Sequence, residues 1–198
     1  MDIVVSDFMS LDGVVQAPGG QEEDTEGGFT NGGWSMPYFD FETMGPAIDE
    51  VMQGTDALLF GRVTWQNMAA AWPERGGEDE FSDRMNSIPK YVASRTLTDA
   101  DMSWSNSTLL AAYDSIAAIR ELREKPGRNL QVMGSPTLVR QLVSADLVDE
   151  YRLMVEPILL GGGKRVFPDD GVARPLQLVS TTTSGTGVLI CAYRRVRS

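Results

Sequence analysis

Three short stretches carry side chains and backbone groups that could bind an anion. They are Gly61-Arg62-Val63-Thr64, Ser94-Arg95-Thr96 and Gly134-Ser135-Pro136-Thr137, and each follows an apolar run. The start of a helix leaves backbone N–H groups free and favours anions, while arginine offers a planar set of donors that suits phosphate. Together the stretches predict a nucleotide along the ends of several strands, with Arg62 and Arg95 available for a phosphate ester on its ribose.

Each of these stretches is a weak signal alone. None is the G-x-G-x-x-G fingerprint of a dinucleotide fold or a Walker P-loop. For the first stretch, the alternative is that Gly61 only makes a turn and that Arg62 is a solvated surface residue. Open α/β sheets bind ligands beyond the carboxyl ends of their strands, so the prediction requires all three stretches to reach the same edge.

Two acidic residues are candidates for proton transfer or substrate orientation. Asp12 lies beside Gly13 just after the first apolar run, and a partly desolvated aspartate can act as a proton donor or hydrogen-bond partner. The alternative is that Asp12 only holds the Asp12-Gly13 turn. Glu156 precedes Pro157 in an apolar run, where burying a charge without a partner is costly. For Glu156 a catalytic role and an ordinary edge-strand position both stay open.

Three further residues are candidates for the substrate. Trp34 and Tyr38 could form the walls of a site for a flat ring, although packing into the core is the alternative. Lys164, which follows three glycines, could hold a substrate phosphate or lie at a solvated hairpin tip. The polar segment 16–33 has the length of a functional or disordered loop, and we interpret its acidic residues 22–26 as a solvated face.

Composition excludes several function classes. The 198 residues predict a single domain, 1–198, with the apolar and charged content of an ordinary globular protein. With no histidine and one cysteine, the chain has no Ser-His-Asp triad, no Cys/His metal cluster and no disulfide framework. The net charge of −11 argues against nonspecific binding to nucleic acid or anionic membranes. No apolar run is long enough for a membrane span or signal peptide, so we expect a cytoplasmic protein.

The apolar periodicity predicts alternating strands and helices. Strands are expected at 3–9, 56–60, 90–97, 130–133, 149–155, 176–183 and 188–196, and helices at 41–53, 65–71, 81–86, 114–125 and 136–144. Segment 184–187 contains two glycines and indicates a terminal hairpin. This order predicts a three-layer α/β/α sandwich with a mixed, mostly parallel sheet and a C-terminal antiparallel hairpin.

The set of motifs resembles one known family. Ser10-Leu11-Asp12-Gly13, Gly61-Arg62-Val63-Thr64-Trp65, Ser94-Arg95-Thr96-Leu97, Gly134-Ser135 and the stretch from Val148 to Phe167 occur in the order found in the dihydrofolate-reductase-like superfamily. They are most similar to the reductase domain at the C-terminus of the riboflavin-biosynthesis deaminase/reductase. No deaminase part with its zinc ligands is present in the sequence, so the resemblance is to a stand-alone reductase.

The resemblance implies NADPH as cofactor. It implies that Gly61, Arg62 and Thr64 lie at the cofactor phosphates, that Ser94, Arg95 and Thr96 surround the 2′-phosphate, and that the corner from Gly134 to Leu138 holds the pyrophosphate. The full set of cofactor residues is Val14, Val15 and Ala17 near the nicotinamide, Gly61, Arg62, Val63, Thr64, Ser94, Arg95, Thr96, Gly134, Ser135, Thr137 and Leu138. The family often has Gly-Gly where this chain has Gly134-Ser135.

The resemblance also implies an activity. The implied activity resembles that of 5-amino-6-(5-phosphoribosylamino)uracil reductase, which transfers hydride to a carbonyl or imine carbon while a neighbouring atom takes a proton. The alternatives are a dihydrofolate or pterin reductase and an NADPH-binding protein without turnover. For a true dihydrofolate reductase the acid expected on the first helix is not clearly placed, since Asp40, Glu42, Asp49 and Glu50 are all candidates. A homodimer is expected from the resemblance.

Overall fold

One mixed sheet forms the centre of the molecule. We analysed a computed structural model that describes residues 1–110 and 114–196, and within these residues eight strands form a sheet in the order β4-β3-β2-β5-β1-β6-β8-β7. The strands are β1 (Asp2–Ser10), β2 (Thr55–Gly61), β3 (Lys90–Ala93), β4 (Ser107–Leu110), β5 (Asn129–Val132), β6 (Glu150–Glu156), β7 (Leu176–Thr183) and β8 (Leu189–Arg195). The pairs β6–β8 and β8–β7 are antiparallel, and the other neighbours are parallel. The predicted fold class is confirmed.

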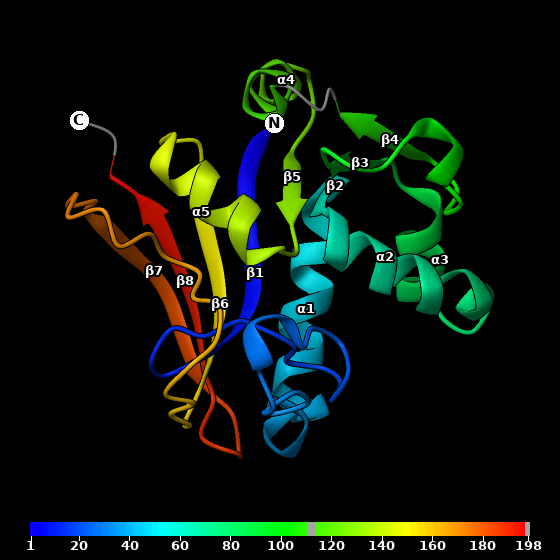
Figure 1. Cartoon of the computed structure of the whole chain (residues 1–198). Helices are drawn as coiled ribbons and strands as arrows, with labels where there is room; N and C mark the ends of the chain where they lie inside the picture. The colour runs from blue at the N-terminus through cyan, green and yellow to red at the C-terminus, as the bar shows by residue number, and fades with distance from the viewer. Residues whose placement is uncertain (111–113, 197–198) are drawn as a thin grey trace.

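Helices cover both faces of the sheet. The helices are α1 (Phe41–Gly54), α2 (Arg62–Ala71), α3 (Glu80–Ser87), α4 (Ser115–Arg123) and α5 (Pro136–Ser144), with short 3-10 turns at Glu26–Gly28, Met36–Tyr38, Pro73–Arg75 and Asp99–Asp101. Successive side chains of a strand point to opposite faces. Leu58 and Phe60 of β2 therefore pack against α1, α2 and α3, whereas Leu59 packs against α4 and α5. Figure 1 shows α5 crossing in front of β1 and β6.

Aspartates define the starts of three helices. Asp40, Asp79 and Asp114 each accept a hydrogen bond from a backbone N–H in the first turn of α1, α3 and α4. This satisfies a donor that has no partner within the helix. Pro136 occupies the first position of α5, where its fixed φ suits a helix. The preceding Ser135 makes no capping bond, and its hydroxyl instead contacts Thr64.

The structure differs from the predicted elements at two strands and at one helix. The strand expected at 90–97 ends at Ala93, because the Ser94 hydroxyl accepts hydrogen bonds from the backbone N–H groups of Thr96 and Leu97 and closes a turn. Edge strand β4, which pairs with β3, was not predicted. The helix expected at 65–71 begins three residues earlier, at Arg62, directly after β2. The strand therefore opens into the helix without an intervening loop.

The C-terminal hairpin is the most exposed part of the sheet. Strands β7 and β8 pair antiparallel from Leu176↔Arg195 to Thr183↔Leu189, as predicted, and lie at one edge in Figure 1. All eight residues of β7 are exposed, and Leu176, Leu178 and Val179 present apolar side chains. Among the described residues, no helix has the length and apolar content needed to cross a membrane.

The connections after β2 and β5 open a crevice between these neighbouring strands. From β2 the chain enters α2 and moves towards β3, whereas from β5 it enters α5 on the opposite face and moves towards β6. Ligands of open α/β sheets bind at such a reversal, beyond the carboxyl ends of the strands. The first turns of α2 and α5 and the turn after β3 all reach this edge.

Candidate functional site

A cleft of about 590 Å³ lies over the carboxyl ends of β2, β3 and β5. It is lined by the first turns of α2, α4 and α5, the turn after β3, and the loop after β1. The lining includes all but two of the residues predicted to bind a cofactor, namely Val15, Ala17, Gly61, Arg62, Val63, Thr64, Ser94, Arg95, Thr96, Ser135, Thr137 and Leu138. The structure thus brings the three predicted stretches to one site, and their binding roles stay predictions.

The corners after β2 and β5 touch each other at the floor of the cleft. The Gly61 N–H donates to the Gly134 carbonyl (3.2 Å), and the hydroxyls of Thr64 and Ser135 are 3.0 Å apart. A Cβ atom on Gly61 would lie 2.5 Å from Ser135 Oγ, which is closer than real contacts allow. The φ of Gly61 is −80°, which any residue can adopt, so the backbone conformation does not require glycine here. Glycine is needed because the two corners approach each other so closely. Gly134 supports the cleft from beneath without lining it.

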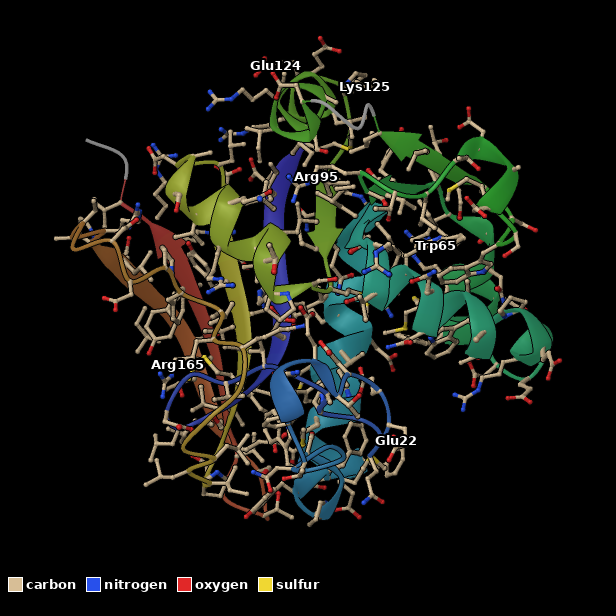
Figure 2. The ribbon with its side chains drawn as sticks, viewed as in Figure 1. Glu22, Trp65, Arg95, Glu124, Lys125 and Arg165 are labelled. Atoms are coloured by element: carbon tan, nitrogen blue, oxygen red, sulfur yellow. The ribbon has the colours of Figure 1, made fainter. Side chains whose placement is uncertain are left out.

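Two arginines of the cleft have uncompensated positive charge. Arg62 and Arg95 are both exposed and line the cleft. Arg62 donates to the Gln66 side chain (3.1 Å), and within residues 1–110 and 114–196 no carboxylate lies within ion-pair distance of either guanidinium. Figure 2 shows Arg95 on the side of the sheet that α4 and α5 cover. This part of the cleft favours an anionic ligand.

The loop after β1 crosses the cleft and brings carboxylates into it. Glu23, Asp24 and Glu26 line the cleft together with Lys164. The Lys164 ammonium pairs with Asp24 (2.7 Å) and Glu26 (2.6 Å), and the Asn67 side chain on α2 donates to the Glu23 carbonyl (2.9 Å). Glu22 and Glu26 are exposed, as expected of a solvated face, but three acidic residues of segment 22–26 also line the cleft. Lys164 does reach the cleft, but two carboxylates already compensate its charge, so it is a poor phosphate ligand.

Asp12 is held away from the cleft. Its carboxylate accepts hydrogen bonds from the Ser10 hydroxyl (2.6 Å) and from the backbone N–H groups of Leu160 (3.1 Å) and Gly161 (2.9 Å). The Ser10 hydrogen bond, followed by the two backbone bonds, lowers the pKa of Asp12 to about 2. An aspartate with this pKa stays ionised at neutral pH and cannot donate a proton. These contacts favour the alternative weighed for Asp12, in which it holds a turn.

Glu156 is completely buried and also lies outside the cleft. Its Oε1 accepts a hydrogen bond from the Ser35 hydroxyl (2.5 Å), and its Oε2 has no partner among the described residues. Burial raises the pKa of Glu156 to about 7, against the opposing effect of the Ser35 hydrogen bond. In register, Glu156 lies opposite Ser10 of β1. The carboxyl therefore joins segment 33–39 to the sheet, and the geometry gives no path from it to the cleft.

Trp34, Tyr38 and Val14 pack rather than line the cleft. Trp34 clusters with Val14, Ala17 and Phe29, and its ring N–H donates to the Gln16 carbonyl (2.8 Å). Tyr38 is half-buried beside the cluster formed by α1 and β6, and its carbonyl accepts from Thr186 (2.6 Å). Neither aromatic residue is in the lining of the cleft, and their predicted role towards a substrate stays a prediction. Val14 faces the same cluster, whereas Val15 faces the cleft.

Asp7 was missed by the sequence analysis. It lies in the middle of β1, and its Oδ2 atom is buried without a hydrogen-bond partner in the described part of the chain. Burial raises the pKa of Asp7 to about 8. On α1, by contrast, Glu42, Asp49 and Glu50 are exposed, and Asp40 caps the helix. The signal available in the sequence was an acid within an otherwise apolar strand in the centre of the sheet.

Comparison with known proteins identifies the family. The model of the RibD C-terminal domain matches residues 2–190, and the chain therefore belongs to this family. Two Bacillus subtilis (strain 168) proteins are similar over nearly their whole lengths. Uncharacterized protein YyaP is 26% identical and covers 96% of this chain and 93% of its own length, and uncharacterized protein YwjB is 24% identical, with 91% and 90% covered.

Solved structures share the fold. A putative riboflavin biosynthesis protein from Shewanella sp. PV-4 superposes with a TM-score of 0.71 at 20% identity, covering both chains completely. A pyrimidine reductase-like protein from Corynebacterium diphtheriae gives 0.60 at 14% identity, covering 100% of this chain and 92% of its own. Enterococcus faecalis dihydrofolate reductase, solved with NADP(H) and RAB-propyl, gives 0.61 at 13% identity, with 99% and 97% covered.

Proposed function

We propose that this member of the RibD C-terminal domain family is an NADPH-dependent reductase that transfers hydride to a carbonyl or imine carbon of a pyrimidine- or pterin-type substrate. The observation that carries the proposal is the convergence of three strand-end corners on one cleft, with two guanidinium groups that pair with no carboxylate of the described residues. A dinucleotide needs such an extended edge with donors for several phosphates. NADPH, when bound, supplies the hydride.

Of the two arginines, Arg95 is the one that supports NADPH rather than NADH. The cofactors differ by the 2′-phosphate, which carries additional negative charge. Arg95, with Ser94 and Thr96 beside it, is assigned to this phosphate, and Arg62, at the first position of α2, to the phosphates that approach the helix start. In the first turn of α2 the Thr64 N–H already donates to the Ser135 hydroxyl (3.4 Å), whereas the N–H groups of Arg62 and Val63 have no side-chain cap among the described residues, which also fits an anion.

The acidic loop bears on the substrate. Lys164 is compensated by Asp24 and Glu26, and Glu23 is also in the lining, so the described residues provide no uncompensated cation for a phosphate at this end of the cleft. A phosphate group on the substrate would therefore be poorly compensated at this end of the cleft. This observation favours a reductase of an unphosphorylated pterin or pyrimidine over a reductase of the phosphoribosyl intermediate of riboflavin biosynthesis.

The test is a pair of dissociation constants, for NADPH and NADH, measured by fluorescence titration. We expect NADPH to bind at least tenfold more tightly. NADPH oxidation is then followed at 340 nm with a panel of dihydropterins, aminopyrimidines with and without a ribosyl phosphate, and small carbonyl compounds. Binding without oxidation of NADPH by any compound would support a binding protein without turnover. Failure to bind either cofactor would refute the proposal.

We also propose that the protein is a homodimer that pairs through β7 and the adjoining hairpin surface. An exposed edge strand with apolar side chains is a surface that proteins usually cover. Leu176, Leu178 and Val179 lie on β7, and Leu189 and Val196 are exposed nearby. Light scattering should give twice the mass of the 21.7 kDa chain, and Leu178→Glu should shift it towards the monomer. A monomeric mass for the unmodified protein would exclude this assembly.

A further inference from the structure

The position of Asp7 places a carboxyl beside the floor of the cleft. Asp7 shares one face of β1 with Val5 and Met9, both of which pack against α4 and α5. Its register partner on β6 is Leu153, and the pairing of β1 with β5 ends two residues earlier, at Val5↔Val132. Beyond that point β5 gives way to the Gly134-Ser135 corner. Asp7 is therefore flanked by this corner on one side and by β6 on the other.

Residues around Asp7 connect it to the cleft. Val15 and Leu138 belong to the same apolar cluster as Val5 and Met9, and both also line the cleft. The side chain of Asp7 emerges between Val5 and Met9 on the face that these two residues cover. The residue is half-buried as a whole, whereas its Oδ2 atom is enclosed without a partner. A buried polar atom without a partner requires an explanation, and a ligand supplied from the cleft is one.

Other carboxyls near the site have partners that occupy them. Asp24 and Glu26 pair with Lys164, Asp114 caps α4, and Asp12 accepts three hydrogen bonds. Glu156 shares with Asp7 the feature of a buried oxygen without a partner in the described residues, but its other oxygen is bonded to Ser35 and it lies outside the cleft. Among the described residues, Asp7 is thus the carboxyl beside the cleft that has a buried oxygen atom without a partner.

We propose that Asp7 is the proton donor of the reduction, and that its carboxyl hydrogen-bonds the nitrogen or oxygen atom of the substrate C=N or C=O group. This inference rests on the proposed reductase function and adds a residue to it. The substrate carbon accepts a hydride from the reduced nicotinamide while the π electrons move to the heteroatom. The heteroatom takes the proton from Asp7, leaving an aspartate that solvent reprotonates after product release. The balance is C=X plus hydride plus proton giving CH–XH, with NADPH oxidised to NADP⁺.

The surroundings of Asp7 keep it protonated at neutral pH. The side chains that share its face on β5 and β6 are Leu130, Val132, Tyr151, Leu153 and Val155, of which Tyr151 is titratable and has a pKa of about 12 because of its burial. From α5 the packed residues are Leu138, Val139 and Leu142. The charged groups of the cleft are Arg62, Arg95, Lys164, Glu23, Asp24, Glu26 and Asp114. Burial is the cause of the raised pKa of Asp7, and no charged partner opposes it.

The first experiment does not depend on turnover. The side-chain carboxyls are labelled with ¹³C-aspartate, and their chemical shifts are followed between pH 4 and 10 in the unmodified protein and in Asp7→Asn. We expect one resonance that titrates near pH 8 and is missing from the variant. NADPH dissociation constants should agree within twofold between the two proteins and Glu156→Gln. An Asp7 resonance that titrates below pH 5 would overturn the proposal.

The second experiment separates the proposed donor from a structural role. With a substrate from the panel, Asp7→Asn should lower kcat by about 10²–10⁴-fold, the usual range for a lost proton donor. In the unmodified protein, the rate constant of single-turnover hydride transfer should fall as the pH rises above the pKa of Asp7. In Asp7→Asn, this rate constant should be independent of pH. Glu156→Gln, which changes the other buried carboxyl, should retain kcat within about threefold and keep the normal pH profile.

The outcomes distinguish the two proposals. If the unmodified protein binds and oxidises NADPH while Asp7→Asn keeps more than a tenth of kcat and the same pH profile, the role of Asp7 is refuted and the reductase function stands. If the unmodified protein binds no NADPH, the reductase function and the role of Asp7 fall together. Equal losses in Asp7→Asn and Glu156→Gln, with lower melting temperatures in both, would also overturn the proposal, because they would indicate a general structural effect.

Discussion

The contact between Gly61 and Ser135 gives a quantitative prediction about the floor of the cleft. In Gly61→Ala the new Cβ would lie 2.5 Å from Ser135 Oγ, 2.9 Å from Ser135 Cβ and 3.1 Å from Ser135 N. Because two of these three atoms belong to one short side chain, most of the clash should disappear in Ser135→Gly. Overpacking of this kind destabilises a protein by about 1–3 kcal/mol. We therefore expect Gly61→Ala to cost about 1–3 kcal/mol, with most of that cost removed by the second substitution.

A double-mutant cycle isolates this contact. Urea unfolding of the parent, both single variants and the double variant gives a coupling free energy, which we expect to reach at least about 1 kcal/mol. The lower capping preference of alanine at the start of α2, and any loss of the bond between Ser135 and Thr64 on removing the hydroxyl, appear in the single variants and cancel in the cycle. Gly45→Ala is the matched control, since its Cβ would meet nothing within 4 Å; it should stabilise α1 by about 0.5–1 kcal/mol.

The result that would refute the reasoning is additivity. If Gly61→Ala costs the same in the parent and in Ser135→Gly, to within about 0.3–0.5 kcal/mol, the two corners do not touch as described. A parallel titration with NADPH then decides whether the contact matters for binding. We expect Gly61→Ala to weaken NADPH binding in the parent background and to weaken it less when residue 135 is glycine, because the clash displaces both corners.

Three further predictions concern the arginines, Asp7 and a buried lysine. Arg95→Ala should weaken NADPH binding by roughly 1.5–3 kcal/mol, the value of a charge-assisted bond, and leave NADH binding nearly unchanged, whereas Arg62→Ala should weaken both; fluorescence titration tests this. Asp7→Asn should be more stable than the parent by roughly 1–3 kcal/mol at pH 8. Because the folded pKa of Asp7, about 8, lies above its unfolded value of 3.8, this difference should grow between pH 4 and 8 and level off above, as urea unfolding at several pH values can show. Lys90→Met should destabilise by at least about 1–3 kcal/mol, because the ammonium donates to the carbonyls of residues 86, 88 and 105 and lies 4.4 Å from the Trp104 ring.

Local signals were sufficient for the edge of the sheet where the cleft lies. The stretches after Phe60, Ala93 and Met133 each combine the end of an apolar run with a glycine, serine or proline, and these residues specify turns and helix starts through their own backbone preferences. Since the carboxyl ends of parallel strands share one edge, three such turns must meet there. The prediction of the cleft lining therefore needed no knowledge of long-range contacts.

Contacts between distant segments decided the residues on which the sequence left alternatives. Asp12 follows a strand and precedes a glycine, which fits a turn as well as an active site. Its role is decided by hydrogen bonds from the backbone N–H groups of Leu160 and Gly161, which lie far from Asp12 in the sequence. Lys164 was equally ambiguous until the loop after β1 supplied Asp24 and Glu26. No spacing rule connects these segments, because the conformation of a loop this long depends on the surface it packs against.

Asp7 shows a different kind of failure, since the necessary information was present in a single strand. In a parallel sheet covered on both faces, the central strands read as continuous apolar runs, and a carboxyl within one must be neutralised, paired or used. The run from Ile3 to Met9 is interrupted only by Ser6 and Asp7. The prediction of a strand over the whole run was correct, but it did not consider that a buried strand of this kind should not contain an aspartate. An unpartnered carboxyl in such a strand lowers the stability of the folded protein. The burial that causes this loss also raises the pKa of the carboxyl, and a raised pKa beside a ligand cleft is what proton donation at neutral pH requires.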